Sequence, residues 1–255
     1  MLYGKSISLI IPCKNEGKGI ARLIKKLPSY LDEIIVVDNN SADNTYQEAK
    51  SAGAKVFKEA RSVNGIGYGF SHLTGLKHAQ GDYLFAMDGD DTYPSREIKN
   101  VLKYLVKNNL DVVSCNRLPL NYPAAISKTR KLGIDILNFE IKLLYGYPIK
   151  DTLTGMWAIK KEAINKLKLS EGGWDLSPEV KLSAIMNPSL RFSEYHVDHF
   201  KRDDSSVSKQ KIWQTGLNHL GYIFKKRFTT YNPLLKLLSW NNYRIFYPAT
   251  NQIIP

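Results

Sequence analysis

Cysteine is scarce in this sequence, with two residues among 255. Cys13 and Cys115 each lie in an apolar run that is typical of a β-strand. Two thiols are too few for a disulfide framework or for a cysteine-based zinc site. We therefore expect both thiols to be reduced and buried, as in a cytoplasmic protein.

Long apolar runs are also missing. The segment after Met1 has no apolar stretch of the kind found in secretory signals. No stretch of about 18 apolar residues occurs elsewhere, so we expect no transmembrane helix. The protein is therefore expected in the cytoplasm, and any contact with a membrane should be peripheral, on its cytoplasmic face.

Acidic residues are in the minority, because 24 Asp and Glu stand against 36 Lys and Arg, for a formal net charge of +12. This excess favours anionic partners, which include nucleic acid, phosphorylated small molecules and acidic membranes, although a solvated basic surface explains it equally well. The hydrophobic fraction of 43% is that of an ordinary globular protein with a core.

What the sequence does contain is a regular alternation of short apolar runs with segments that have apolar residues at helical spacing. This alternation predicts an α/β domain with a mostly parallel central sheet and helices on both faces. We expect strands at 8–12, 33–38, 55–57, 82–88, 111–115, 157–159 and 191–197. In the second half we expect helices at 128–144, from 161, at 178–186 and at 209–227. The predicted organisation is one domain over residues 1–227 and an aromatic-rich tail over 228–255.

The strongest local signal is Asp88-Gly89-Asp90-Asp91 at the end of a predicted buried strand. Carboxylates this close repel one another, and a Mg²⁺ or Mn²⁺ ion that bridges to a diphosphate would offset the repulsion. Gly89 lets the backbone turn and a ligand approach closely. An acidic turn that caps the next helix explains the same residues.

Two other predicted strands end in comparable turns. Asp38 is followed by Asn39-Asn40-Ser41, and the first strand ends at Pro12 and continues into Asn15-Glu16. Each turn can contact a nucleoside, but each, taken alone, is better explained by helix capping. Because the carboxyl ends of parallel strands lie at one edge of a sheet, a single nucleotide site explains all three turns together.

Together these segments resemble the family 2 glycosyltransferases, which have the GT-A fold, a Rossmann-like three-layer architecture. The resemblance rests on residues 8–16, 36–45 and 88–90. Further along, residues 151–155 (Asp-Thr-Leu-Thr-Gly) are similar to the D-x-x-(S/T)-G segment of the polyprenyl-phosphate branch, which includes the dolichyl-phosphate mannose synthases. Residues 200–209 are similar to the R…SK segment of the same branch.

The resemblance implies an inverting transfer of a hexose, mannose or glucose, from a GDP- or UDP-sugar to a polyprenyl phosphate. For the nucleotide sugar it implies Pro12, Asn15, Glu16, Asp38, Asn40, Gly67, Asp88 and Gly89. For the metal ion it implies Asp88 and Asp90, and for catalysis Asp88, Asp90, Arg117 and Arg202. For the phosphate of the acceptor it implies Arg117, Arg130, Arg202 and Lys209.

The sequence departs from that branch at several places. Asn39 stands where the family often has Asp, which removes one acidic contact to the nucleoside. Residues 91–94 read Asp-Thr-Tyr-Pro instead of Leu-Gln-His-Pro, which leaves open whether Asp91 contacts the metal. Residues 203–207 lack the usual glycine, so the phosphate contact there is open too.

Two kinds of acceptor fit the sequence. A lipid phosphate is already ionised at neutral pH, whereas a glycan hydroxyl needs a base to take its proton. Asp151, Asp175 and Glu179 are the candidates for that base, but each also fits a turn, a solvated position or the start of a helix. The lack of a convincing base favours the phosphate, with a glycan hydroxyl as the alternative.

Basic clusters at 128–131, 201–211 and 225–227 would attract anionic lipids, next to which the aromatic tail would lie. Solvated charges and a tail packed on the domain explain the same residues. The glycines at 65, 67 and 69 form either a loop over the donor or only a tight turn.

Two other classes fit parts of the sequence. A nucleotidyltransferase would share the sheet and the acidic ligands, but it usually has a glycine-rich basic loop near the N-terminus, which is missing here. A nucleic-acid binder fits the charge, with Trp213 and Tyr222 among Lys and Arg, but leaves the acidic motif unexplained. We therefore expect no nucleic-acid partner.

Overall fold

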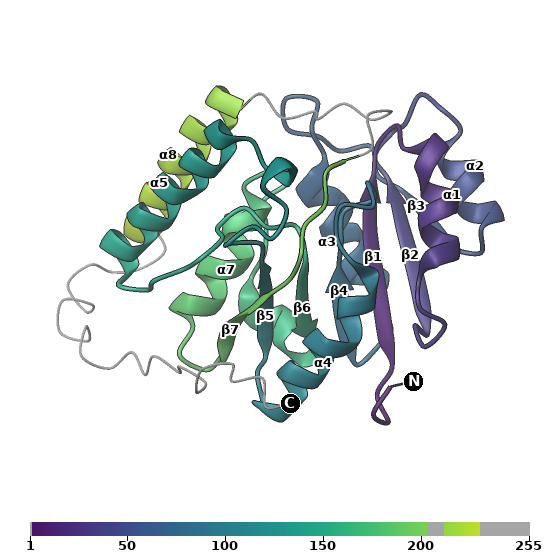
Figure 1. Cartoon of the computed structure of the whole chain (residues 1–255), viewed down its shortest axis with the longest axis horizontal. Helices are drawn as coiled ribbons and strands as arrows, with labels where there is room; N and C mark the ends of the chain where they lie inside the picture. The colour runs from purple at the N-terminus through teal and green to yellow at the C-terminus, as the bar shows by residue number, and fades with distance from the viewer. Residues whose placement is uncertain (1, 203–211, 230–255) are drawn as a thin grey trace.

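The structure, a computed structural model, describes residues 2–202 and 212–229. Its centre is a seven-stranded sheet in the order β3-β2-β1-β4-β6-β5-β7 (Figure 1). All neighbouring strands are parallel except that β6 runs antiparallel to β4 and β5. The strands are β1 (Ile7–Cys13), β2 (Glu33–Asp38), β3 (Lys55–Lys58), β4 (Tyr83–Ala86), β5 (Val112–Asn116), β6 (Trp157–Lys160) and β7 (Phe192–His196).

Helices cover both faces of this sheet (Figure 1). The helices are α1 (Gly17–Lys26), α2 (Thr45–Ser51), α3 (Tyr68–His78), α4 (Ile98–Lys107), α5 (Lys128–Tyr145), α6 (Ile164–Leu167), α7 (Leu176–Met186) and α8 (Ile212–Thr229). Short 3₁₀ turns lie at Ser95–Glu97, Pro123–Ala125 and Lys161–Ala163. The predicted α/β fold class, a mostly parallel sheet between two helical layers, is confirmed.

Strand β1 shows why its sequence is a continuous apolar run. Leu9 and Ile11 belong to a core cluster shared with α1 and α4, whereas Ile10, between them, belongs to a cluster on the opposite face with α3, α5 and α7. Successive side chains of a strand point to opposite faces, so a strand covered on both sides must be apolar throughout. All three side chains are fully buried.

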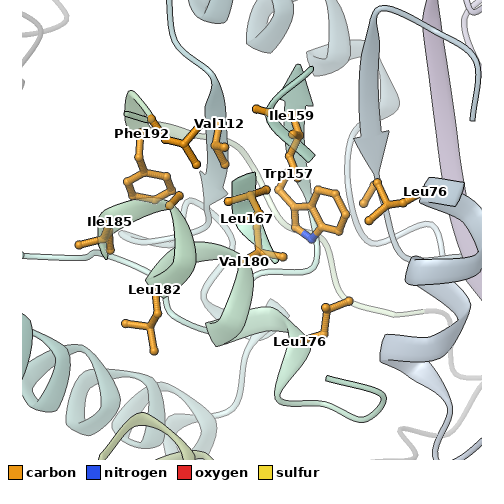
Figure 2. Packing of buried hydrophobic residues seen from close by; sticks show 14 of the residues in the cluster. Leu76, Val112, Trp157, Ile159, Leu167, Leu176, Val180, Leu182, Ile185 and Phe192 are labelled. Carbon is orange, nitrogen blue, oxygen red and sulfur yellow. The ribbon is translucent and has the colours of Figure 1, made fainter. Parts of the chain in front are cut away.

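The second half of the chain builds its own part of the core around β6. Figure 2 shows the Trp157 side chain between the sheet and α7. Its neighbours in that cluster include Val112, Ile159, Leu176, Val180, Leu182, Ile185 and Phe192. Burying these apolar side chains contributes on the order of 1.5–3 kcal/mol each, which holds α7 against β5, β6 and β7.

Element boundaries differ from the sequence prediction in ways that matter for the site. The strand predicted at 82–88 ends at Ala86, so Asp88 lies on the turn beyond it. The last helix covers Ile212–Thr229 and passes the predicted domain boundary at 227, while residues 230–255 lie outside the described residues. Within the described ranges, the helices are all too short or too polar to span a bilayer.

Helix α4 offers a matched test of how much core packing stabilises the fold. Val101 is fully buried, whereas Val106 on the same helix is 41% exposed. Val101→Ala should lower the free energy of unfolding by about 2 kcal/mol, since it deletes two buried carbons and leaves a cavity. Val106→Ala should change it by less than about 0.5 kcal/mol. Urea denaturation with an unchanged m-value measures both, and equal losses would contradict this packing.

Candidate active site

The carboxyl edge of the sheet carries a cavity of about 240 Å³. Asp88 follows β4, Gly155 precedes β6 and Arg117 follows β5. Because β6 lies antiparallel between β4 and β5, these three residues meet at the same edge. Helices α5 and α8 form the opposite wall, through residues such as Ile134 and Gly216. The cavity therefore lies where ligands bind in open α/β sheets.

Two carboxylates lie at the floor of the cavity. The Tyr68 hydroxyl donates a hydrogen bond of 3.2 Å to Asp88 Oδ1. Asp90 accepts hydrogen bonds from the backbone N–H and the hydroxyl of Thr92 (3.3 and 2.7 Å) and pairs with the Arg202 guanidinium. Burial, together with the neighbouring charge of Asp90, raises the pKa of Asp88 to about 7. Keeping both carboxylates ionised in this site is therefore unfavourable, and a bound cation would offset their repulsion.

These residues fit a divalent cation that a ligand helps to coordinate. In residues 2–202 and 212–229 no group of three or more His, Cys, Asp or Glu side chains is arranged as a complete metal site. Mg²⁺ is commonly bound through one or two carboxylates plus the phosphates of a substrate. Asp88 and Asp90 can supply the two carboxylates of such a site. Asp91 does not belong to it, because its carboxylate pairs with Lys26 at 2.5 Å.

Basic side chains gather beside the acidic pair. Arg117 forms a two-pronged ion pair with buried Asp151, with Nε–Oδ2 and Nη2–Oδ1 distances of 2.7 and 2.9 Å. This pairing holds the pKa of Asp151 below its usual value despite its burial. Burial and the charges of Arg202 and Arg117 lower the pKa of Arg130. Three guanidinium groups therefore converge at this wall.

The residues predicted to bind the nucleotide sugar divide into two groups. Pro12, Glu16, Gly67 and Gly89 line the cavity, together with Asp88. The other three, Asn15, Asp38 and Asn40, are not among its lining residues. Lys209, predicted for the acceptor phosphate, lies outside the described residues.

The three residues that do not line the cavity shape its rim. Asp38 Oδ1 accepts hydrogen bonds from the backbone N–H (3.1 Å) and the hydroxyl of Ser41. Asn15 Oδ1 accepts a hydrogen bond from the Ala42 N–H (2.8 Å), which joins the loops after β1 and β2. Asn15 and Asn40 both have a φ of +52°, which Asn tolerates better than most residues. Their contact with a nucleoside stays a prediction.

Asn39 explains one departure from the family pattern. Its Nδ2 donates to the carbonyls of Glu59 (2.8 Å) and Arg61 (3.2 Å), while its Oδ1 accepts from the Gly67 N–H (3.0 Å). An aspartate in this place could not donate to either carbonyl. A Cβ on Gly67 would come within 2.2 Å of Asn39 Nδ2, so the glycine is required for this close approach.

The three candidate bases have distinct surroundings. Asp151 is fully buried and committed to Arg117. Glu179 is also buried and accepts hydrogen bonds from the backbone N–H groups of Ser170 and Glu171 (2.9 and 2.8 Å), so it organises the loop before α7. Asp175 Oδ1 instead lies 2.6 Å from His219 Nδ1, within hydrogen-bond distance, and His219 lines the cavity.

Sequence reasoning missed several residues of the cavity. Tyr68 and Trp174 stack at its wall, with ring centroids 4.7 Å apart. His199 also lines it, and burial with the charge of Arg117 lowers its pKa to about 4, so it is neutral at pH 7. Tyr68 is the first residue of α3, whereas Trp174 and His199 lie on separate loops. Of the three, only Tyr68 had a sequence signal, because it lies among the glycines at 65, 67 and 69.

A nucleotide-sugar glycosyltransferase is the class of protein that this fold and cavity define. The sequence matches glycosyl transferase family 2 over residues 8–168, and the chain belongs to that family. It is an inverting-type transferase that uses a nucleotide sugar.

Three known proteins give the range of its similarities. Glycosyltransferase AglJ of Haloferax volcanii is 26% identical over 237 residues, which cover 90% of this chain and 74% of that protein. The dolichol-phosphate mannosyltransferase of Pyrococcus furiosus is 27% identical over 68% of this chain, which spans about half of its length (51%). The structure shares the fold of the glucosyl-3-phosphoglycerate synthase of Mycobacterium tuberculosis, which was crystallised with Mn²⁺, UDP and glucosyl-3-phosphoglycerate. The TM-score is 0.66 at 18% sequence identity, and the superposition covers 88% of this chain and 80% of that one.

Gly155 tests how tightly Asp88 is positioned. A Cβ at Gly155 would lie 2.6 and 2.7 Å from the two Asp88 carboxylate oxygens, so Gly155→Ala must displace them. We expect kcat/KM for sugar transfer to fall on the order of 100-fold, the usual effect of a displacement of about 1 Å in a catalytic group. Gly19→Ala on α1 is the control, since its Cβ meets no atom within 4 Å, and steady-state kinetics should show no loss there.

The Arg117–Asp151 pair predicts a stability effect. Asp151→Asn removes the carboxylate and leaves a buried guanidinium uncompensated, which should cost about 3–5 kcal/mol in the free energy of unfolding. The double variant Arg117→Met with Asp151→Leu should recover much of that loss, because neither member of the pair is left as an unpaired buried charge. Denaturation curves measure both, and a single variant as stable as the native chain would show that the pair is not buried in solution.

Proposed function

We propose that this chain transfers a hexose from a nucleoside-diphosphate sugar to a polyprenyl phosphate, at the cytoplasmic face of a membrane. The single observation that carries the proposal is that one cavity brings together an acidic pair, guanidinium groups and apolar side chains. Asp88 and Asp90 line it, as do the guanidinium-bearing side chains of the arginines and the apolar side chains Ile134 and Leu137. A cation-bound diphosphate suits the carboxylates, and an anionic lipid headgroup suits guanidinium groups beside apolar side chains.

In the proposed reaction Asp88 and Asp90 would hold Mg²⁺ or Mn²⁺, which would supply positive charge to offset the negative charge that develops on the departing nucleoside diphosphate. Pro12, Glu16 and Gly89, on the turns after β1 and β4, and Gly67, just before α3, would place the nucleotide sugar. Arg202 contacts Asp90 and would stabilise the same developing charge from the side.

The acceptor phosphate would be held by Arg117 and Arg130. Asp151 keeps Arg117 in place through two hydrogen bonds, so its guanidinium is fixed before the acceptor arrives. An ionised phosphate attacks the sugar directly and needs no base. The similarity to the dolichol-phosphate mannosyltransferase supports this kind of acceptor.

Transfer to a glycan hydroxyl is the second candidate, and one observation favours it. His219 lines the cavity and is hydrogen-bonded to Asp175, the arrangement by which a carboxylate orients an imidazole base. A hydroxyl acceptor would place its proton within reach of this pair. The two candidates therefore differ in whether His219 takes part in the chemistry.

The proposed metal role predicts that Asp90→Ala abolishes transfer. The assay combines the protein, Mn²⁺, a panel of GDP- and UDP-sugars, and polyprenyl phosphate, with detection of a labelled lipid. We expect a loss of at least 1000-fold in kcat, since no other carboxylate replaces Asp90 in the acidic pair. Asp91→Ala is the matched control, because its side chain pairs with Lys26 instead. Full activity of Asp90→Ala, or full activity under strong chelation, would refute the metal role.

His219→Asn separates the two acceptors. If the acceptor is a lipid phosphate, kcat should change less than about threefold, because no proton is removed. If it is a glycan hydroxyl, kcat should fall on the order of 10²–10⁴-fold, the contribution of a general base. The product provides an independent check, since a glycosyl lipid phosphate is labile to mild acid.

A further inference from the structure

Helices α5 and α8 pack side by side at one end of the molecule (Figure 1). The Tyr145 hydroxyl donates to the Ile223 carbonyl at 2.7 Å, and Arg227 Nε donates to the Leu144 carbonyl at 2.7 Å. These bonds tie the last turns of the two helices together. The pair therefore acts as one unit on the outside of the α7 layer.

Helix α5 is apolar on two opposite faces. Its inner face packs on the core through Ile134, Leu137, Ile141 and Tyr145. Its outer face carries a second stripe at spacings of four, three and four residues, formed by Leu132, Ile136, Phe139 and Leu143. Phe139 and Leu143 are each 65% exposed. A surface helix normally presents polar residues there, so the outer stripe needs a partner.

Helix α8 carries a matching stripe. Its members are Trp213, Leu217, Phe224 and Phe228, spaced by four, seven and four residues. Trp213 is 76% exposed, and the rings of Phe224 and Phe228 stack with centroids 4.9 Å apart. Of the thirteen large apolar side chains exposed in the described part of the chain, nine lie on α5 and α8. Such a concentration marks an interaction surface.

The charges around the two stripes indicate what kind of partner fits them. Lys128, Lys131 and Lys142 are exposed on α5, and Lys225 is exposed on α8. Asp135 is the only exposed acidic residue in these two helices, and it is paired with Lys131. Aromatic and aliphatic stripes bordered by lysines are typical of helices that lie in the interface of an anionic bilayer.

We propose that the exposed stripes of α5 and α8 form a surface that docks on an anionic lipid bilayer, with Phe139, Trp213 and Phe224 inserted among the headgroups. This docking surface adds to the proposed function. It depends on that function only for the claim that the bilayer supplies the acceptor. The same two helices line the cavity through Ile134, on the inner face of α5, and Gly216. The docking surface would therefore hold the cavity one helix diameter, roughly 10 Å, from the bilayer.

The test measures binding of the full chain to vesicles. Native protein should co-sediment with vesicles of phosphatidylcholine and phosphatidylglycerol more strongly than with phosphatidylcholine alone. Phe139→Glu with Phe224→Glu should reduce the apparent affinity at least tenfold, because two apolar anchors are lost and two negative charges face the lipid. Val106→Glu is the matched control, since it places the same charge at an exposed apolar position on α4.

A second readout separates this inference from the proposed function. The Phe139→Glu, Phe224→Glu variant should keep its transfer rate with a short, water-soluble prenyl phosphate and lose at least tenfold with a long-chain acceptor in vesicles. If neither acceptor is glycosylated by native protein, the proposed function fails, while the vesicle binding still decides the docking surface. Unchanged vesicle binding by the variant overturns the inference. In that case, a variant with half the mass of the native protein in light scattering would identify a second copy of the chain as the occupant of the stripes. A variant with a lower melting temperature than the native protein would identify residues 230–255 as the occupant.

Discussion

The repulsion between two carboxylates held close together at the end of β4 is the constraint on which the rest of the site depends. Asp88 and Asp90 lie on one turn, partly removed from water, and the pKa of Asp88 rises to about 7 in consequence. The surrounding residues reduce that cost without cancelling it. Tyr68 donates a hydrogen bond to Asp88, and Arg202 pairs with Asp90. An arrangement that remains unfavourable until a cation arrives makes binding of that cation favourable.

The segment Asp151-Thr152-Leu153-Thr154-Gly155, which precedes β6, supports this turn at the same edge of the sheet. Asp151 fixes Arg117, and Gly155 leaves room for the Asp88 carboxylate. Lys181, fully buried on α7, donates to the Thr154 carbonyl (3.1 Å) and the Ser177 carbonyl (2.8 Å). Burying an ammonium group is costly, and the pKa of Lys181 falls to about 8. The motif therefore positions charged groups around the acidic turn.

Sequence patterns predicted the parts of the fold that depend on local periodicity. Strands β1, β2, β4 and β5 were expected because a strand buried on both faces must be a continuous apolar run. The acidic turn was expected to bind a ligand because it directly follows such a run. Asn39 was identified as a departure, but its reason required the structure, since the two carbonyls it contacts come from the loop after β3.

Other features could not be found in this way. The pairing of Asp175 with His219 joins residues 44 positions apart, and no local pattern predicts such a pairing. The outer stripes of α5 and α8 were hidden because an apolar face is ordinarily read as core. Asp38 shows why a carboxylate at a strand end is ambiguous: in the structure it accepts hydrogen bonds from Ser41, and its contact with a nucleoside stays a prediction. Short polar residues serve turns and ligands alike, and sequence does not separate the two.

The position of β6 has a consequence for how the chain is built during translation. Strand β4 pairs on one side with β1, which precedes it, and on the other with β6, which begins 71 residues after β4 ends. Until residues 157–160 have left the ribosome, strand β4, which contains Leu84 and Phe85, is an open edge of the sheet. Strand β5 cannot join the sheet until then, because β6 lies between β4 and β5. Exposed apolar edges invite pairing with other chains. A nascent chain arrested between β5 and β6 would therefore present this edge of β4 to other chains.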